Sequence, residues 1–407
     1  MTNNKDKKVL NVPNLRFPEF TGEWMKCKFG EIATGFDYGM NAAAKPYDGQ
    51  NKYIRITDID EASSTYNNSS IVSPDGILSE NYVVNEGDIL LARTGASTGK
   101  SYLYRKSDGK LYYAGFLIRA NVAEHNPYFV FSQLHTHRYW RWVSIMSARS
   151  GQPGINSLEY ASFPIFTTTL KEENKISSLL SLIDERITTQ NKIIEKYESL
   201  IQAICDTLIE SGQPKVELSF NDFGEPYSGL SGKSAEDFGK GWPYITYMNV
   251  YQNQIIDITD VGLVKINETE QQSVVRYGDI LFTLSSETPD EVGMGAVYLG
   301  DIYPLYLNSF CFGVHITDES KIYPPFLAYY ISTKSFRKAV FPLAQGSTRF
   351  NLQKSDFMKK KFLFPTVEEQ NKIYSVLKAY SDKLSIEKNI ANLLCEQKSY
   401  LLRQLFI

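Results

Sequence analysis

Cysteine, histidine and long apolar runs are scarce in this chain of 407 residues. Its 4 cysteines lie far apart without a Cys-x-x-Cys pair, which argues against a disulfide framework or a cysteine zinc site and favours reduced thiols. No apolar run approaches the about 20 residues that a membrane-spanning helix requires. The polar, basic start Met1–Lys8 is not followed by the apolar core of a secretory signal. We therefore expect a cytoplasmic protein with no membrane partner.

An excess of charge of one sign is also lacking. The 43 lysine and arginine residues nearly balance the 46 acidic residues, which gives a net charge of −3. This balance argues against a protein covered with phosphate-binding side chains, although it says nothing about local patches. The hydrophobic content of 43% is ordinary for a globular protein, so a largely disordered chain is excluded. The length predicts two or more domains.

The chain repeats itself. The segment Tyr82–Leu90 (YVVNEGDIL) recurs as Ser273–Leu281 (SVVRYGDIL), and Glu172–Ile176 (EENKI) recurs as Glu369–Ile373 (EQNKI). The matched blocks keep their order, at an offset that drifts only from 191 to 197 residues. The sequence therefore predicts a tandem duplication of about half the chain.

Each half begins with short apolar alternations broken by Gly, Pro, Asn and Ser, which predict strands joined by turns. In the first half these strands are expected at Asp88–Ala92, Ser101–Tyr104 and Lys110–Arg119. A helical stretch opened by a proline follows near Pro127–Met146, and again near Pro324–Phe341.

Each half ends in a long stretch without Pro or Gly that carries a heptad repeat. A 3.5-residue period over five heptads predicts coiled-coil helices. A helix of about 38 residues spans about 57 Å, so we expect each to be a strut that its own domain cannot cover. The predicted seam positions include Ile176, Leu180, Ile183, Ile187, Gln190 and Ile194 in the first helix, and Leu377, Leu384, Glu387, Leu394 and Leu401 in the second.

Two of these seam positions are polar. Gln190 and Glu387 occupy equivalent places near the middle of their helices, and they would meet if the helices pair about their centres. One interpretation is a polar contact that fixes the register at some loss of stability. The alternative is that Glu387 reaches solvent while Gln190 packs through its methylene groups.

Two similar domains, each followed by a long helix, fit together most simply in a pseudo-two-fold arrangement in which the two helices are antiparallel. We therefore predict an α+β fold with a first domain over residues 1–170, a long helix over 171–211, a second domain over 212–365 and a second long helix over 366–407. Such an object would hold two binding modules at a fixed separation. Duplex DNA, whose backbone has two-fold symmetry, suits this geometry as a partner.

Several segments resemble the specificity subunit of type I restriction-modification enzymes. They are the paired Gly-Asp-Ile-Leu blocks Gly87–Leu90 and Gly278–Leu281, the segment Leu15–Phe20 (LRFPEF), the segment Pro365–Gln370 (PTVEEQ), and Lys233–Ser234 followed by Gly241–Val250 (GWPYITYMNV). The resemblance covers essentially the full length, repeat included. One departure is Thr168, which stands before the first helix where the second copy has Pro365.

The resemblance implies a subunit that is not itself an enzyme. Each target-recognition domain would read one half of a bipartite, asymmetric site in double-stranded DNA, and the coiled coil would set the spacer between the halves. Two methyltransferase subunits and two endonuclease–translocase subunits would assemble on it. S-adenosylmethionine, ATP and Mg²⁺ would belong to those partners, with no cofactor in this chain. The alternative is a scaffold whose duplicated domains bind proteins and not DNA.

Base recognition requires hydrogen-bonding groups on loops that reach a groove. In the first domain the loop Arg93–Lys100 directly follows the Gly-Asp-Ile-Leu strand, and the equivalent loop of the second domain is Thr283–Glu287. The two loops differ in charge and length, as expected if each half reads a different sequence. The alternative is that such a loop is merely a turn. The candidate contacts are Arg93, Thr94, Ser97 and Lys100 in the first loop, and Ser285 and Ser286 in the second.

A second candidate segment follows in each half. Arginine suits guanine, and glutamine and asparagine suit adenine. A run of lysine residues lies beside the second copy of this segment. It would either bind DNA phosphates or form a surface that is simply exposed to solvent. The candidates are Arg149 and Gln152 in the first half, and Gln345, Ser347, Thr348, Arg349, Asn351 and Lys354 in the second.

Two further sets of candidate DNA contacts have weaker support from the sequence. Arg138 and Arg141 alternate with aromatic residues, a pattern that can neutralise and stack on nucleic acid. The aromatic residues themselves are expected to pack in the core, which leaves only the two arginines as phosphate contacts. Lys233 is a candidate through the resemblance alone.

No catalytic or metal site is predicted. Thr94–Ser101 nearly matches a phosphate-binding loop, but it begins with Thr, and a strand is expected where that loop requires a helix. Asn126–Phe129 lacks the second proline of an amino-methyltransferase motif, so Pro127 is better explained as a helix start. His135 and His137 have no carboxylate or cysteine cluster around them. Glu173–Lys175 echoes a nuclease Glu-x-Lys but lies on the predicted coiled coil.

Overall fold

The structure, a computed structural model, describes residues 10–61, 63–148, 153–211 and 215–407. It divides into two compact units: unit 1 holds Met1–Gln190 with Ile390–Ile407, and unit 2 holds Asn191–Asn389. The division falls within two long helices, α5 (Leu170–Ser211) and α10 (Val367–Leu405). Each unit therefore contains a part of both helices, and each is described by itself.

Unit 1 is built on a four-stranded antiparallel sheet in the order β2-β9-β6-β7. The Gly-Asp-Ile-Leu block enters β6, whose five residues are all buried. The strands are β2 (Thr34–Tyr38), β9 (Leu117–Asn121), β6 (Asp88–Ala92) and β7 (Ser101–Leu103). Three two-stranded pairs accompany the sheet: antiparallel β1 (Met25–Lys28) with β10 (Pro164–Thr167), antiparallel β3 (Ala43–Pro46) with β5 (Val72–Asp75), and parallel β4 (Lys52–Ile54) with β8 (Leu111–Tyr113).

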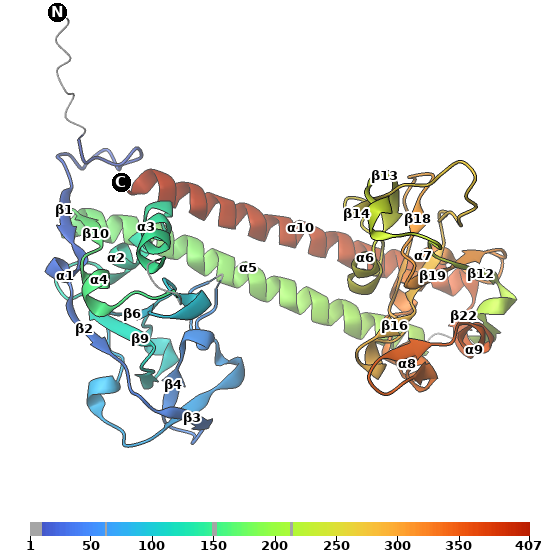
Figure 1. Ribbon diagram of the computed structural model, residues 1–407, viewed down its shortest axis with the longest axis horizontal. Coiled ribbons are helices and arrows are strands. Elements are labelled where there is room, and N and C mark those ends of the chain that lie inside the picture. Colours follow the sequence, from blue (N-terminus) through green and yellow to red (C-terminus); the bar gives the residue numbers. More distant parts are fainter. Residues whose placement is uncertain (1–9, 62, 149–152, 212–214) are drawn as a thin grey trace, which may run out of the picture. The chain divides into compact units, whose positions relative to one another are not determined.

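Helices cover this sheet in unit 1 (Figure 1). They are α1 (Phe29–Ile32), α2 (Pro127–Gln133), α3 (His137–Ser147) and α4 (Ser157–Ala161). The single helical stretch expected over Pro127–Met146 is wrong in one respect, because it is broken between α2 and α3. Thr136 causes the break, since its hydroxyl oxygen accepts the Tyr139 amide (3.4 Å) and caps α3 in place of a continuing helix.

Unit 2 repeats the topology of unit 1. Its four-stranded sheet has the order β12-β19-β15-β17, with β15 in the place of β6 and β19 in the place of β9. The strands are β12 (Gly224–Ser228), β19 (Cys311–Ile316), β15 (Ile280–Thr283) and β17 (Gly295–Val297). The shared strand order confirms at the level of the fold the duplication that the sequence predicts.

The other elements of unit 2 also have counterparts in unit 1. An antiparallel pair joins β11 (Lys215–Ser219) to β22 (Lys361–Pro365), as β1 joins β10. The parallel pair is β13 (Phe238–Ile245) with β18 (Tyr306–Leu307), and β14 (Val261–Val264) extends it. A small sheet joins β16 (Ser285–Ser286), β21 (Phe350–Leu352) and β20 (Ala344–Gln345). The helices are α6 (Tyr247–Gln252), α7 (Pro324–Tyr330), α8 (Lys334–Val340) and α9 (Lys354–Lys359). The single helical stretch expected near Pro324–Phe341 is therefore also divided, between α7 and α8, where the Thr333 hydroxyl oxygen accepts the Phe336 amide (3.2 Å).

The two long helices run antiparallel within each unit. In unit 1 Asp184 of α5 forms an ion pair with Lys398 of α10 (2.6 Å), and in unit 2 Glu198 of α5 pairs with Lys388 of α10 (2.7 Å). In unit 1 the earlier residues Ile176 and Leu180 of α5 share an apolar cluster with the later residues Leu402 and Leu405 of α10, and in unit 2 Cys205 and Ile209 share one with Ile373 and Leu377. Within each unit the residue number thus falls along α10 as it rises along α5, which confirms the predicted antiparallel coiled coil. Every predicted seam residue is buried or half-buried: Ile176, Leu180, Ile183, Ile187, Gln190, Ile194, Leu377, Leu384, Glu387, Leu394 and Leu401.

The two polar seam residues fall in different units. Gln190 belongs to unit 1 and Glu387 to unit 2, and both are buried. Glu387 also forms an ion pair with Lys383 of its own helix (2.6 Å), so it does not extend freely into solvent. A register-fixing role for the pair stays a prediction.

None of the helices in the described part of the chain is long and apolar enough to cross a membrane.

Candidate nucleic-acid interface

The loop that follows β6 in unit 1 is held on both sides by backbone hydrogen bonds. The Arg93 amide donates to the Phe116 carbonyl oxygen (3.1 Å), and the Arg93 carbonyl oxygen accepts the Ile155 amide (2.9 Å). Thr94 forms an antiparallel bridge with Gly154. The first candidate loop therefore lies beside the chain that leaves the second candidate segment, whose Arg149 and Gln152 are outside the described residues.

The same arrangement recurs after β15 in unit 2. The Leu284 amide donates to the Phe310 carbonyl oxygen (2.9 Å), and the Leu284 carbonyl oxygen accepts the Leu352 amide (2.8 Å). Ser285 of β16 then pairs with Asn351 of β21. In unit 2 the first and second candidate segments thus meet at the end of the strand that carries the Gly-Asp-Ile-Leu block, and in unit 1 the first loop meets Gly154 and Ile155 at the equivalent place.

A polar hairpin forms the outer part of this region in unit 2. Strands β20 and β21 are joined by the turn Gly346–Arg349, and the exposed side chains on the hairpin are those of Gln345, Ser347, Thr348, Arg349 and Asn351. Gly346 has φ 141, and a Cβ there would lie 2.0 Å from the Arg349 carbonyl oxygen, so the turn requires glycine. The hairpin thus exposes an arginine, a glutamine and an asparagine, which are the side-chain types that can pair with guanine and with adenine. Lys354 in α9 is half-buried, and its Nζ donates to Ser228 Oγ (3.1 Å).

Arg93 is the corresponding base-reading candidate in unit 1. Its guanidinium lies 4.8 Å from the centre of the Tyr38 ring, a cation–π distance. The Tyr38 hydroxyl in turn accepts the Ser157 amide (3.3 Å), and this hydrogen bond and the nearby Arg93 charge lower the pKa of Tyr38. The ring therefore holds Arg93 in place without consuming its hydrogen-bond donors.

The other candidates of the first loop are as buried as Arg93. Thr94 and Ser97 are half-buried around the short 3₁₀ turn Gly95–Ser97, and Arg93 is half-buried too. Lys100 forms an ion pair with Glu61 (3.0 Å). Of the two long cationic side chains of the loop, Lys100 is therefore paired with a carboxylate, whereas Arg93 rests on the Tyr38 ring.

In the second loop the candidate serines are buried. Ser286 Oγ donates to Glu291 Oε2 (3.0 Å), and the Ser285 carbonyl oxygen accepts the Tyr247 hydroxyl (2.7 Å). Ser285 and Ser286 therefore support the strand that carries the hairpin, and the exposed candidate residues of unit 2 are those on the hairpin itself.

The helical arginines of unit 1 have different surroundings. Arg138 lies over the rings of Phe163 (5.4 Å) and Phe166 (4.6 Å), and burial lowers its pKa to about 10. Arg141 is exposed. Trp142 packs against Phe163, with ring centres 5.0 Å apart, and Tyr139 is buried, as expected for core residues. The expected core role is wrong for Trp140, which is 43% exposed.

Lys233 is enclosed in unit 2. Its side chain is only 4% exposed and forms an ion pair with Glu270. A buried and paired lysine at this position stabilises the loop before β13, and it is poorly placed to reach a phosphate.

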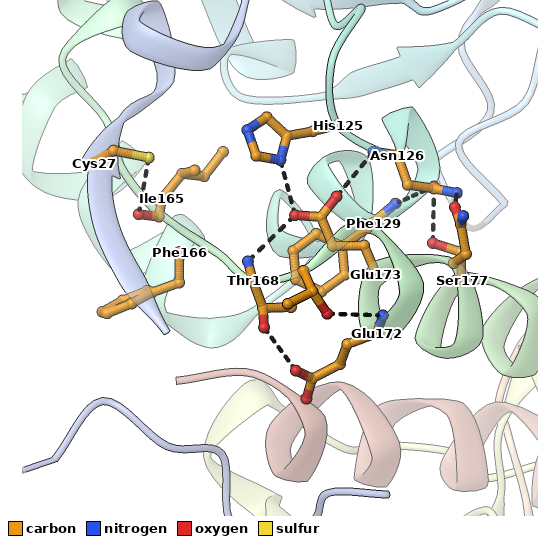
Figure 2. Close-up of polar contacts among 12 residues, drawn as sticks. Cys27, His125, Asn126, Phe129, Ile165, Phe166, Thr168, Glu172, Glu173 and Ser177 are labelled. Atoms are coloured by element: carbon orange, nitrogen blue, oxygen red, sulfur yellow. Dashed lines mark hydrogen bonds and ion pairs between the residues drawn. The ribbon is translucent and has the colours of Figure 1, made fainter. Parts of the chain in front are cut away.

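No pattern in the sequence predicts a structural role for Glu173, which holds the start of α5 in unit 1. Figure 2 shows its carboxylate pointing toward His125 and Asn126. It is fully buried and accepts hydrogen bonds from the amides of Asn126 (2.9 Å) and Thr168 (3.3 Å). It also lies within hydrogen-bond distance of His125 Nδ1 (2.9 Å). The carboxylate thereby joins the long helix to the residue that caps α2.

Gln370 takes the same place at the start of α10 in unit 2. Its Oε1 accepts the Tyr323 amide (2.7 Å), as Glu173 accepts that of Asn126. Its Nε2 donates to the Pro365 carbonyl oxygen (2.8 Å) and the Lys321 carbonyl oxygen (3.4 Å). Pro365 has no amide hydrogen to donate, whereas Thr168 has one, so the amide side chain suits the second copy and the carboxylate the first. The first copy thus has Thr168 where the second has Pro365, and it correspondingly has Glu173 where the second has Gln370.

Comparison with known proteins agrees with the duplicated fold. The family described as "Type I restriction modification DNA specificity domain" matches residues 228–396. The specificity subunit of the type I restriction enzyme MjaVIII from Methanocaldococcus jannaschii is 22% identical over 337 residues, covering 77% of this chain and 76% of that protein. Residues 228–396 therefore match this specificity-domain family, and the chain is similar over most of its length to a type I restriction enzyme specificity subunit.

Solved structures of this family share the fold. The type I restriction-modification S subunit from M. genitalium superposes with a TM-score of 0.56 at 17% identity, covering 97% of this chain and 99% of that one. A chain from a structural study of complex assembly in the type I restriction-modification system gives 0.57 at 16% identity, with 94% and 97% coverage.

The catalytic and metal motifs that the sequence analysis rejected have structural explanations in this chain. The loop Thr94–Ser101 leads into strand β7, not into the helix of a phosphate-binding loop. Asn126 caps α2, which begins at Pro127. His135 Nδ1 donates to the Phe131 carbonyl oxygen, and His135 Nε2 shares a hydrogen bond with Ser64 Oγ (2.9 Å each). Among the described residues, no group of three or more His, Cys, Asp or Glu side chains could hold a metal ion.

Proposed function

We propose that the chain reads a bipartite, asymmetric site in double-stranded DNA, with unit 1 on one half and unit 2 on the other. The observation that carries this proposal is the shared arrangement around Arg93 and Leu284, in which the same backbone frame bears different side chains. An identical frame places both surfaces alike, and different side chains give each half its own sequence. Arg93 in unit 1, and Gln345, Arg349 and Asn351 in unit 2, are the proposed base contacts.

The chain acts as a non-catalytic scaffold for other subunits. The antiparallel α5 and α10 set the spacer between the two half-sites, and two methyltransferase and two endonuclease–translocase subunits assemble on the chain. Those partners bind S-adenosylmethionine, ATP and Mg²⁺. With a net charge of −3, the isolated chain is expected to bind DNA weakly, because the partners supply much of the phosphate neutralisation.

Nuclease protection of the chain in complex with its methyltransferase partner tests this proposal. A duplex that carries the methylated site of the host is compared with duplexes in which either half, or the spacer, is scrambled. We expect two protected patches, each lost only when its own half is scrambled, and no effect of spacer sequence. Equal binding to the cognate and fully scrambled duplexes would favour the protein-binding scaffold instead.

The spacer role has a separate test. Inserting four residues, about one turn, into both α5 and α10 lengthens each helix by about 6 Å. At about 3.4 Å per base pair, the preferred spacer should grow by one or two base pairs with both half-sites unchanged. A change in the half-site sequences would contradict the role of the helices as a spacer.

A further inference from the structure

Two phenylalanines stand at equivalent places beside the candidate loops. Phe116 immediately precedes β9 and Phe310 immediately precedes β19, which are equivalent strands of the two sheets. Each lies in a tight turn: the Leu117 amide donates to the Ala114 carbonyl oxygen (2.8 Å), and the Cys311 amide to the Asn308 carbonyl oxygen (3.0 Å). The two turns are thus built in the same way.

Both side chains are open to solvent. Phe116 is 57% exposed and Phe310 is 56% exposed, and neither belongs to the packed apolar clusters of its unit. The residues before them differ, Ala-Gly in one turn and Asn-Ser in the other, and yet phenylalanine recurs. A single exposed apolar residue is ordinary. The same exposed ring at the same turn of both units, with no packing role in either, calls for a functional explanation.

The backbone of each phenylalanine is hydrogen-bonded to a residue at a candidate base-reading surface. The Phe116 carbonyl oxygen accepts the Arg93 amide, and the Phe310 carbonyl oxygen accepts the Leu284 amide, one residue before β16. A surface that brings Arg93, or the β20–β21 hairpin, to a groove therefore brings the neighbouring ring to it as well. The two rings are parts of the same two surfaces, so duplex DNA is their occupant.

We propose that Phe116 and Phe310 are apolar DNA contacts, each placed in the groove of its own half-site against the bases. This inference rests on the proposed function and adds its apolar component. Aromatic and apolar side chains that enter a groove or stack on bases contribute affinity without neutralising phosphate. Such contacts suit a chain of net charge −3, because they do not depend on an excess of lysine and arginine.

Phe116→Ala and Phe310→Ala variants of the chain in complex with its methyltransferase partner test the inference. The probe is a duplex carrying the site determined by methylome sequencing. Base stacking is worth about 1–3 kcal/mol, so each variant should bind about 5- to 150-fold more weakly. Protection should be weakened in one half-site only, and in opposite halves for the two variants. Because no charge is removed, the slope of log affinity against log salt should stay unchanged.

Tyr277→Ala is the matched control. Tyr277 is 64% exposed in unit 2, but it precedes β15, whereas Leu284 follows that strand, so the two lie at opposite ends. The control should bind DNA as the unmodified chain does. Phe116→Leu and Phe310→Leu should retain most of the affinity, because the side chain stays apolar. If an alanine variant melts at a lower temperature, glutamine, which is of similar length but polar, takes its place with the same expectations.

The outcomes separate this inference from the proposed function. If the unmodified complex distinguishes cognate from scrambled DNA but the phenylalanine variants bind within twofold of it, the inference is overturned and the proposed function stands. A steeper or shallower salt slope, or equal loss in both half-sites, also overturns it. If the unmodified complex does not distinguish the two duplexes, the proposed function fails and the inference fails with it.

Discussion

The guanidinium of Arg93 lies 4.8 Å from the centre of the Tyr38 ring. Arg93 directly follows β6, and its backbone is fixed between Phe116 and Ile155. An arginine whose backbone is fixed and whose side chain rests on an aromatic face loses little freedom on binding, which suits bidentate contact with guanine.

Replacing Arg93 with alanine should weaken recognition at one position of one half-site by about 1–3 kcal/mol. Arg93→Lys should lose most of that discrimination as well, since lysine cannot make the bidentate contact. Tyr38→Phe is the matched control, because it keeps the ring under the arginine. Binding of duplexes with single substitutions in the site measures the effect. Loss of recognition in both half-sites would mean that Arg93 has a structural role.

The hairpin of unit 2 makes a prediction for the other half-site. Gly346→Ala places a Cβ against the Arg349 carbonyl oxygen and should distort the turn that presents Ser347, Thr348 and Arg349. Recognition of that half-site should fall by at least tenfold, while the melting temperature stays nearly unchanged because the turn is exposed. Ser347→Ala, in the same turn, should leave the hairpin intact and have a smaller effect. Equal binding by the Gly346→Ala variant would exclude the hairpin from the interface.

The equivalent residues Glu173 and Gln370 predict an asymmetry in stability. Gln370→Glu would bring a carboxylate oxygen against the Pro365 and Lys321 carbonyl oxygens in a buried site, at a cost of about 3 kcal/mol or more. Glu173→Gln keeps an oxygen for the Asn126 amide and should cost about 1 kcal/mol. Urea denaturation of the two variants measures both. Equal costs would contradict the explanation that Pro365 selects glutamine.

Unit 1 should lose stability in mild acid through His135. Burial lowers the pKa of His135 to about 4 from its ordinary value of 6.5, and the nearby Lys398 lowers it further while Asp184 opposes the change. The unfolded chain therefore binds more protons between these values, so stability is full above about pH 6.5 and falls as the pH drops toward 4. The expected loss is on the order of 2 kcal/mol at pH 5. His135→Gln should flatten this part of the profile in urea denaturation between pH 7 and pH 5, and an unchanged profile would contradict the assignment.

Local sequence patterns predicted the elements whose signal is local. The Gly-Asp-Ile-Leu block became the buried strand β6, and the heptad repeats became α5 and α10, which begin within one residue of the expected boundaries at 171 and 366. The duplication was visible because its blocks retain order. These features depend on neighbours in the chain or on direct comparison of its halves.

Features that depend on distant contacts could not be predicted. The stretch Lys110–Arg119 was expected to be one strand, but a turn at Ala114–Leu117 divides it into β8 and β9, because β8 pairs with β4 while β9 pairs with β2 and β6. No strong turn residue other than Gly115 marks this break. The burial of Ser285, Ser286 and Lys233 likewise depends on partners far along the chain, such as Glu270 for Lys233. Their residue types alone suggest exposure.

The role proposed for Phe116 and Phe310 also required the structure. Their apolar residue type alone suggests a place in the core. Only the turns before β9 and β19, with their hydrogen bonds to Arg93 and Leu284, place the two rings beside the candidate loops.

Single-molecule methylome sequencing of a host that expresses this chain with its methyltransferase partner tests the central claim most directly. The account predicts one methylated motif made of two short specific halves separated by a spacer of fixed length and free sequence. The Arg93→Ala change should relax only one half, and the Gly346→Ala change only the other. A continuous motif, a variable spacer, or no motif that depends on this chain would contradict it.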